Sequence, residues 1–267
     1  AADTACGLLG AGVVDEGSLL LTISSGGQLI SPTSKVEVDL KGRLHTFCSA
    51  LEPSGRQPGW YQMGAILAAG LSLQWLRDQV LSMGHEDGYG RMTAMAAEAP
   101  PGANGLLFLP YLLGERTPHM DPLARGLFLG LTVAHGRAEM IRAVMEGVAL
   151  ACFDAYGALA ELGAEATQIV LAGGGAKSKL WRQIIADVFG LPVRLVSLEE
   201  QAAAGAALLA GGGLNIFKPA TAAREWARYG PDFVPDARTH LHYGRLLGAF
   251  RDAYQKQGQG FKEFWRM

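Results

Sequence analysis

The second half of the chain holds the pattern that most constrains its fold, an alternation of strand, turn, helix, strand and helix. Gln168–Ala172 is an apolar run typical of a buried strand, Gly173–Gly175 supplies a turn, and Ser178–Phe189 has helical spacing. Val193–Val196 then predicts a second strand and Ala202–Ala210 a second helix. This order predicts an α/β domain in which helices cover a sheet.

Other parts of the chain add elements to this core. The first forty residues predict strands, with Ser18–Ile23 and Gln28–Leu40 forming a hairpin. Apolar residues at helical spacing predict an amphipathic helix over Gln62–Val80 and a long helix over Arg137–Leu162, and Gly105–Pro110 is a candidate for a short buried strand. A further helix is expected near the C-terminus.

Composition excludes several classes of protein. The 267 residues carry 23 Lys and Arg against 25 Asp and Glu, so we expect neither nucleic acid nor a membrane as a partner. Cys6, Cys48 and Cys152 are too widely spaced for a disulfide framework or a zinc site, which favours a cytoplasmic protein. No run of membrane-spanning length and no signal peptide is expected. The first residue is not Met, which suggests a piece of a longer protein.

Glycine is unusually frequent, at 36 residues, when the average share is about 7%. Two glycine turns are candidates for binding phosphate. Ser24–Gly27 joins two strands, so its N–H groups can form an anion nest beside two hydroxyls. Gly173–Ala176 follows a strand and opens a helix, where free N–H groups and the helix dipole favour anions. An ordinary hairpin turn and an ordinary strand-to-helix turn remain the alternatives.

Two well-known nucleotide motifs do not fit the second turn. A Walker-type loop ending at Lys177–Ser178 needs glycine where Leu171 and Ala176 stand. A dinucleotide fingerprint that starts at Gly173 needs glycine where Ser178 stands. A nucleotide would therefore have to bind in another kind of fold.

Longer motifs resemble the second half of the carbohydrate kinases that include glycerol, gluconate and xylulose kinases. The segment LPYLLGERTPH (Leu109–His119) and the HTFC motif (His45–Cys48) are similar to the xylulose kinase branch. AGGGAKSKLWRQIIAD (Ala172–Asp187) is similar to the C-terminal signature of the family, and Ala204–Ala207 resembles its final helix. These motifs occur in the family's order along nearly the whole chain.

The resemblance implies a fold and an activity. Such kinases have two domains of ribonuclease-H-like fold, as in actin and hexokinase, each with a mixed sheet flanked by helices. Residues 1–267 would be the C-terminal, nucleotide-binding domain, and the N-terminal, sugar-binding domain would be absent. The parent enzyme would transfer phosphate from ATP to D-xylulose, and the chain alone would be inactive. Gluconate or ribulose as the sugar, a non-catalytic actin-like nucleotide-binding module, and a homodimer remain open.

The family's catalytic base corresponds to Asp3. In a loose phosphoryl-transfer transition state such a carboxylate orients the sugar hydroxyl and accepts its proton late. The glycines that precede this residue in the family are missing here, either replaced by Ala1 and Ala2 or cut away, so the resemblance does not define how the carboxylate is positioned. The resemblance also implies a Mg²⁺ ion on the phosphates, which Asp3 would reach through water.

The implied nucleotide contacts lie in three segments. The hairpin turn matches a Gly-Thr-Ser-Gly motif, in which Ser25 keeps the hydroxyl and Ser24 replaces a glycine. Gly70 and Gln74 match positions on a helix, and Lys179 stands where relatives have Asn. The full set is Ser24, Ser25, Gly26, Gly70, Gln74, Gly173, Gly174, Gly175, Ala176 and Lys179.

Several other conspicuous residues are expected to be structural. Glu115–Thr117 and His119 are predicted to form a turn or a domain contact, with Arg116 paired to a carboxylate. The remaining histidines lack ligand spacing for a metal. Trp75 and Trp181 are predicted to be core aromatics.

Overall fold

A computed structural model describes residues 2–54, 57–84 and 88–264, and the side chains up to residue 257. Its centre is a six-stranded sheet in the order β3-β4-β2-β1-β7-β8. β1 pairs antiparallel with β2 and parallel with β7, so the sheet is mixed, as expected. The strands are β1 (Ser18–Ile23), β2 (Gly27–Thr33), β3 (His45–Cys48), β4 (Trp60–Ile66), β7 (Gln168–Ala172) and β8 (Val193–Leu195), with β5 (Leu107–Leu109) and β6 (Leu127–Leu129) forming a separate ribbon.

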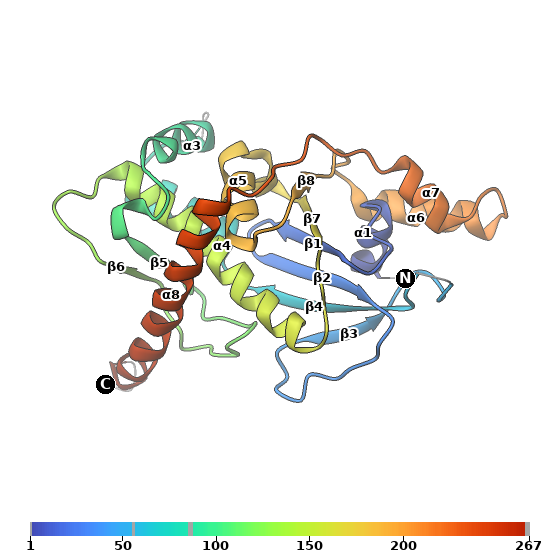
Figure 1. Cartoon of the computed structure of the whole chain (residues 1–267), viewed down its shortest axis with the longest axis horizontal. Coiled ribbons are helices and arrows are strands. Elements are labelled where there is room, and N and C mark those ends of the chain that lie inside the picture. The colour runs from blue at the N-terminus through green and yellow to red at the C-terminus, as the bar shows by residue number, and fades with distance from the viewer. Residues whose placement is uncertain (1, 55–56, 85–87, 265–267) are drawn as a thin grey trace.

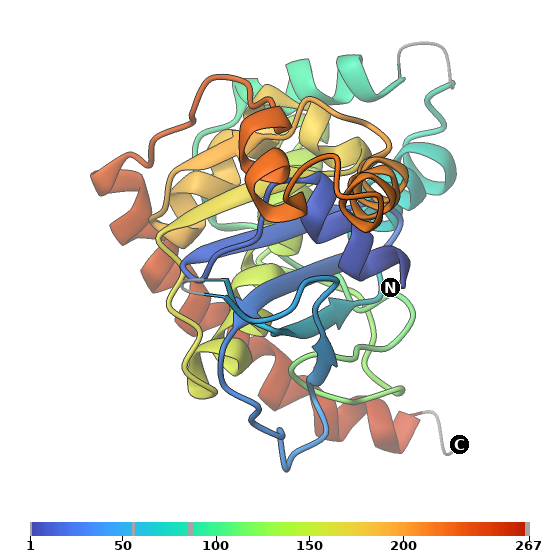
Figure 2. The same cartoon turned by 90° about the vertical axis from the view of Figure 1, so that its right-hand side faces the viewer.

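Helices cover both faces of the sheet (Figures 1 and 2). One layer contains α4 (Arg137–Glu161) and α5 (Lys179–Phe189), against which α8 (Ala237–Phe264) packs. The other contains α1 (Asp3–Gly10), α6 (Gln201–Gly213) and α7 (Pro219–Trp226). The remaining helical elements are α2 (Gly70–Trp75) with its π-helical continuation η1 (Leu76–Val80), α3 (Gly88–Glu98), and the 3₁₀ turns η2 (Ala103–Gly105) and η3 (Gly174–Lys177).

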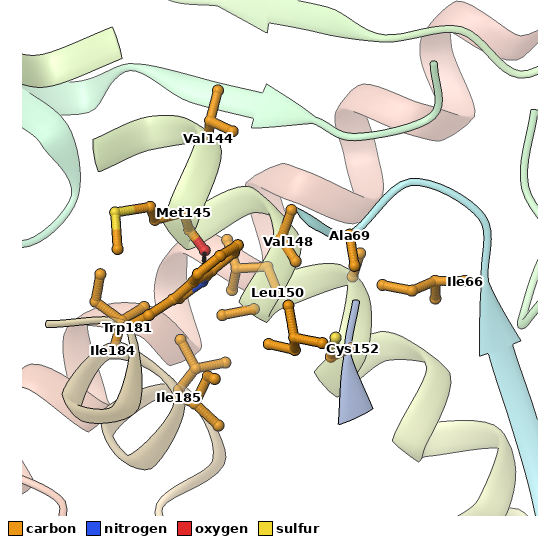
Figure 3. Close-up of a cluster of buried hydrophobic side chains, with 14 of the residues drawn as sticks. Ile66, Ala69, Val144, Met145, Val148, Leu150, Cys152, Trp181, Ile184 and Ile185 are labelled. Carbon is orange, nitrogen blue, oxygen red and sulfur yellow. Dashed lines mark hydrogen bonds between the residues drawn. The ribbon is translucent and has the colours of Figure 1, made fainter. Parts of the chain in front are cut away.

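The central helix α4 is apolar on nearly all sides because it is buried against the sheet, α3 and α5. Among the described helices it alone has the length and hydropathy of a membrane span, which the sequence did not predict. However, 78% of its most apolar stretch is buried inside the protein. Trp181 of α5 is buried against it and donates its indole N–H to the Met145 carbonyl at 2.9 Å (Figure 3). The prediction that Trp181 is a core aromatic is confirmed.

On the opposite face, α1 and α6 approach so closely that their backbones touch. A Cβ on Gly10 would lie 1.9 Å from the Gln201 carbonyl oxygen, and a Cβ on Gly205 would lie 1.9 Å from the Cys6 carbonyl oxygen. No side chain fits at either position, so part of the glycine excess serves to pack these two helices.

The sequence predicted the later elements well. The strands at β7 and β8, the long helix α4 and the C-terminal helix α8 are confirmed. The helix expected over Ala202–Ala210 is also present but longer, because α6 includes the three glycines at 211–213.

Three predictions for the first eighty residues are wrong. Residues 3–10 form the helix α1 instead of a strand, and β2 ends at Thr33 rather than at Leu40. The expected helix over Gln62–Val80 begins only at Gly70, because Gln62–Ile66 belongs to β4 and pairs with β2. The cross-strand ladder therefore overrides the helical spacing of the apolar residues there.

Substitution Gly205→Ala is expected to destabilise the domain because its methyl group would force α1 and α6 apart. Overpacking of this kind costs about 1–3 kcal/mol in the free energy of unfolding. The matched control is Gly7→Ala on α1, where a Cβ meets nothing within 4 Å and where alanine should stabilise the helix by roughly 0.5–1 kcal/mol. Urea denaturation followed by circular dichroism measures both. Equal effects of the two variants would contradict the close helix contact.

Candidate nucleotide site

Three segments that are distant in sequence meet where β1 ends. They are the hairpin turn between β1 and β2, the start of α2, and the glycine turn after β7. β1 and β7 are parallel neighbours in which Thr22 pairs with Ala172, so the hairpin and the glycine turn leave the sheet at the same edge. In open α/β sheets ligands bind outside the carboxyl ends of parallel strands. This edge is therefore the candidate site.

The hairpin turn is held by the N-terminus of α2. The Ser25 carbonyl accepts hydrogen bonds from the Ala69 N–H at 2.9 Å and the Leu71 N–H at 3.0 Å, and the Ser24 carbonyl accepts one from the Gly70 N–H at 2.7 Å. A Cβ on Gly70 would lie 2.4 Å from the Ser24 carbonyl oxygen. Gly70 is thus required by the contact between helix and hairpin.

The glycine turn is fixed against the end of β1. Gly173 has φ +86°, and a Cβ there would lie 2.5 Å from the Ile23 carbonyl oxygen. A Cβ on Gly175 would lie 2.4 Å from Cγ2 of Ile23. Gly174 is exposed and has nothing within 4 Å of such a Cβ, so it is the open position of the turn.

Hydrogen-bond donors remain unused at this edge. Within the described part of the chain, the backbone N–H groups of Ser25, Gly26 and Gly174 donate to no other group. The hydroxyls of Ser24 and Ser25 are exposed and likewise form no hydrogen bond among the described residues. A group of free N–H and O–H donors on two neighbouring turns is suited to binding a polyanion such as a nucleotide phosphate chain.

The other predicted nucleotide residues border these turns. Gln74 lies one helical turn after Gly70 and is exposed, and Lys179 is exposed at the start of α5. Ala176 is fully buried, and its N–H donates to the Gly173 carbonyl at 3.2 Å. The structure therefore brings nine of the ten predicted residues to accessible positions at or beside the turns, and places Ala176 in the core.

Asp3 lies apart from the turns, as the exposed first residue of α1. Its Oδ1 accepts the Thr4 N–H at 2.8 Å, and the helix dipole favours a carboxylate at this end. Among the described residues it forms no hydrogen bond or ion pair with the hairpin or the glycine turn. Ala1 lies outside the described residues. The catalytic role of Asp3 stays a prediction.

The described residues contain no group of three or more His, Cys, Asp or Glu side chains that could hold a metal ion. Asp3 offers one carboxylate and no protein partner for a cation. The described residues thus build no Mg²⁺ site of their own, and a cation here would take most of its ligands from the nucleotide and water.

Comparison with known proteins decides what kind of domain this is. Residues 25–213 match the model of the C-terminal domain of the FGGY family of carbohydrate kinases. The chain belongs to the FGGY family. Its resemblance to the second half of sugar kinases is confirmed.

Among relatives, this FGGY domain is 35% identical to the xylulose kinase of Bacillus subtilis over 254 residues, which is 95% of this chain and 49% of that protein. It is 36% identical to the gluconokinase of the same species over 217 residues, 78% of this chain and 41% of that protein. The chain spans about half the length of the curated relatives it matches.

Solved structures agree with this assignment. The crystal structure of xylulose kinase from Rhodospirillum rubrum superposes with a TM-score of 0.86 at 32% identity, covering 98% of this chain and 51% of that one. Glycerol kinase of Plasmodium falciparum, crystallised with ADP, gives a TM-score of 0.83 at 22% identity, covering 94% of this chain and 50% of that one, a likeness that shows the fold alone. The expected actin- and hexokinase-like fold is confirmed.

The GERTPH segment of the FGGY domain is bound to the edge of β4 just beyond the start of β3. Thr117 donates its N–H to the Ala65 carbonyl at 3.0 Å, and its Oγ1 accepts the Ala65 N–H at 3.0 Å. Nη2 of Arg116 lies 2.9 Å from Nε2 of His45, and its expected pairing with a carboxylate stays a prediction. These contacts support the predicted structural role of the segment.

Glu115 in this segment is a buried carboxyl group, only 2% exposed. Its Oε1 accepts the Leu67 N–H at 2.9 Å and the Arg116 N–H at 2.7 Å, while Oε2 has no hydrogen-bond partner among the described residues. Burial outweighs the two hydrogen bonds and raises the pKa of Glu115 to about 7. Nothing in the sequence indicates this burial apart from the predicted turn in which the residue lies.

The raised pKa of Glu115 predicts a pH-dependent loss of stability. The unfolded carboxyl loses its proton near pH 4.5, whereas the folded one keeps it until about pH 7. The free energy of unfolding should therefore fall as pH rises between these values, by up to about 3 kcal/mol, and stay level above them.

The Glu115→Gln variant lacks this titration and keeps an acceptor for both N–H groups. Urea denaturation of wild type and variant at pH 5 and pH 8 isolates the contribution of Glu115. The variant should gain stability relative to wild type on going to pH 8. A constant difference between the two proteins would show that Glu115 ionises normally.

Proposed function

We propose that this chain forms the nucleotide-binding half of an ATP-dependent sugar kinase that phosphorylates a ketose such as D-xylulose. The observation that carries the proposal is the group of unused N–H and hydroxyl donors where the hairpin and the glycine turn leave the sheet. The names of the xylulose kinase relatives support the choice of sugar. The half of the relatives' length that this chain does not cover supports a sugar-binding N-terminal domain as the partner.

In this proposal the turns hold the nucleotide. The N–H groups of Ser25 and Gly26 and the Ser25 hydroxyl donate to phosphate oxygens, and Gly174 allows the adenosine to approach the backbone. The first N–H groups of α2 already donate to hairpin carbonyls, so the helix contributes by fixing the turn and not by direct contact with phosphate.

Asp3 supplies the acid–base function in this proposal. Its carboxylate orients the sugar hydroxyl and takes the proton as the hydroxyl oxygen bonds to the γ-phosphorus. The bond from that phosphorus to the bridging oxygen breaks, and ADP leaves. Positioning and charge stabilisation supply most of the rate in such reactions.

We also propose a location in the cell and a pairing of two copies. Cys6, Cys48 and Cys152 are free thiols, which supports a cytoplasmic setting. Pairing into a homodimer is a proposal without a contact in this structure to support it.

A second candidate substrate is gluconate, because the gluconokinase of Bacillus subtilis is 36% identical to this chain over 217 residues. Phosphorylation of D-xylulose, D-ribulose and gluconate by the full-length parent, measured through coupled ADP release, distinguishes these sugars. A parent that binds ATP but phosphorylates none of them would favour the non-catalytic, actin-like alternative.

Removing the hydroxyl of the hairpin should weaken nucleotide binding by this chain. A hydrogen bond to a charged group contributes roughly 1.5–3 kcal/mol, so Ser25→Ala should weaken ADP binding about 10- to 100-fold. Gly174→Val should also weaken it by filling the open position of the glycine turn. Isothermal titration calorimetry measures the dissociation constants.

The matched control is Ser34→Ala, which removes an exposed hydroxyl beyond the other end of β2. It should leave the affinity for ADP unchanged. Equal ADP affinity of wild type, Ser25→Ala and Gly174→Val would remove the hairpin and the glycine turn from the nucleotide site.

Replacing the proposed base should affect catalysis and leave nucleotide binding intact. In the full-length parent, Asp3→Ala should lower kcat about 10²- to 10⁴-fold, the usual contribution of a general base. The affinity for ADP should stay at the wild-type value because Asp3 does not touch the turns. The isolated 267-residue chain should show negligible sugar phosphorylation. Near-normal turnover of Asp3→Ala would exclude Asp3 as the base.

A further inference from the structure

The link between β4 and α2 begins with a backbone donor that the sheet cannot satisfy. The ladder between β2 and β4 ends at the pair Gly27–Ile66, so the next N–H, that of Leu67, lies beyond it. Its acceptor is Oε1 of Glu115 at 2.9 Å, a buried carboxyl group 48 residues further along the chain. Since buried N–H groups need an acceptor, the loop supplies what the sheet does not.

The hairpin turn rests directly on this link. A Cβ on Gly26 would lie 3.0 Å from the Ile66 carbonyl oxygen and 3.4 Å from that of Leu67. Only Ala68 separates Leu67 from Ala69, the first of the three residues whose N–H groups hold the hairpin carbonyls. A shift of Leu67 would therefore reach the turn both through this packing and through those hydrogen bonds.

Glu115 itself is firmly placed. Its backbone exchanges a pair of hydrogen bonds with Asp121, each of 2.9 Å, and Thr117, two residues later, is bound to Ala65 of β4. The carboxyl group thus reaches Leu67 from a loop anchored on β4, the strand that ends one residue before Leu67.

We propose that Glu115 is a positioning residue for the nucleotide, which holds the Leu67 N–H and thereby keeps the Ser24–Gly26 hairpin in its binding geometry. This inference rests on the proposed function, because it assigns the hairpin to the phosphates. In the free protein, the hairpin and residues 67–71 should lose order when the Glu115 acceptor is removed.

The test compares four variants of this chain. Glu115→Met removes the acceptor oxygens but keeps a side chain of similar size. Glu115→Asp shortens the side chain by one methylene group, which moves the carboxyl away from Leu67, and Glu115→Gln retains an acceptor oxygen. Thr117→Val is the matched control, because it removes a hydrogen bond between the same loop and β4 at Ala65, and the one that Thr117 donates to the Arg43 carbonyl, while the bond to Leu67 stays in place. Hydrogen–deuterium exchange of residues 24–26 and 67–71 and calorimetric affinity for ADP are measured on each, with urea denaturation to compare stability.

Glu115→Met loses the acceptor of both the Leu67 and the Arg116 N–H, and the loss at Leu67 should increase exchange of residues 67–71 and weaken ADP binding, each about 3- to 10-fold. Glu115→Asp should change both in the same direction, and it replaces Glu115→Met if that variant does not fold. Glu115→Gln should stay within about twofold of wild type in both measurements. Thr117→Val should lose stability without a matching loss of ADP affinity.

Several outcomes would overturn the inference. One is a loss of ADP affinity in Glu115→Met and Glu115→Asp that only follows their loss of stability, as in Thr117→Val. Another is weakened ADP binding in Ser25→Ala with unchanged ADP binding in all Glu115 variants. That outcome would leave the proposed function standing. If wild type itself fails to bind ADP, the proposed function fails. Unchanged exchange of residues 67–71 in the Glu115 variants would separately refute the claim that Glu115 orders these residues.

Discussion

The close packing around the end of β1 is the constraint on which the candidate site depends. Ile23 is fully buried, and its backbone and side chain leave no room for a Cβ on Gly173 or Gly175. The next two residues, Ser24 and Ser25, give their carbonyls to the N-terminus of α2. One strand end thus sets the positions of the hairpin, the helix and the glycine turn together, and the free donors of the site follow from this arrangement.

These contacts separate two kinds of glycine that look alike in a sequence. Gly70, Gly173 and Gly175 are glycines because protein backbone or a core side chain occupies the place of a Cβ. Gly174 has open space there, so it is the position where a ligand can approach the main chain. A family motif marks all of them as part of the site, but only the three-dimensional contacts distinguish support from ligand contact.

The sequence predicted the fold class and the two turns because these depend on local patterns, such as apolar runs and glycine clusters. It failed where long-range pairing decides the structure. Gln62–Ile66 has apolar spacing compatible with a helix, yet its pairing with β2 makes it a strand. The helix α1 is eight residues long and contains Gly7 and Gly10, so its local signal is weak and its packing on α6 stabilises it. The link from Glu115 to Leu67 was beyond prediction because donor and acceptor are far apart in sequence.

The mutual anchoring of the three segments has a mechanical consequence. The hairpin, the start of α2 and the glycine turn are joined by hydrogen bonds and backbone contacts, so none of them can act as an independent lid. A bound nucleotide would travel with this domain as a rigid body. In the proposed two-domain kinase, any closure over a sugar would then be a hinge rotation of whole domains, with its bending residues outside the nucleotide site.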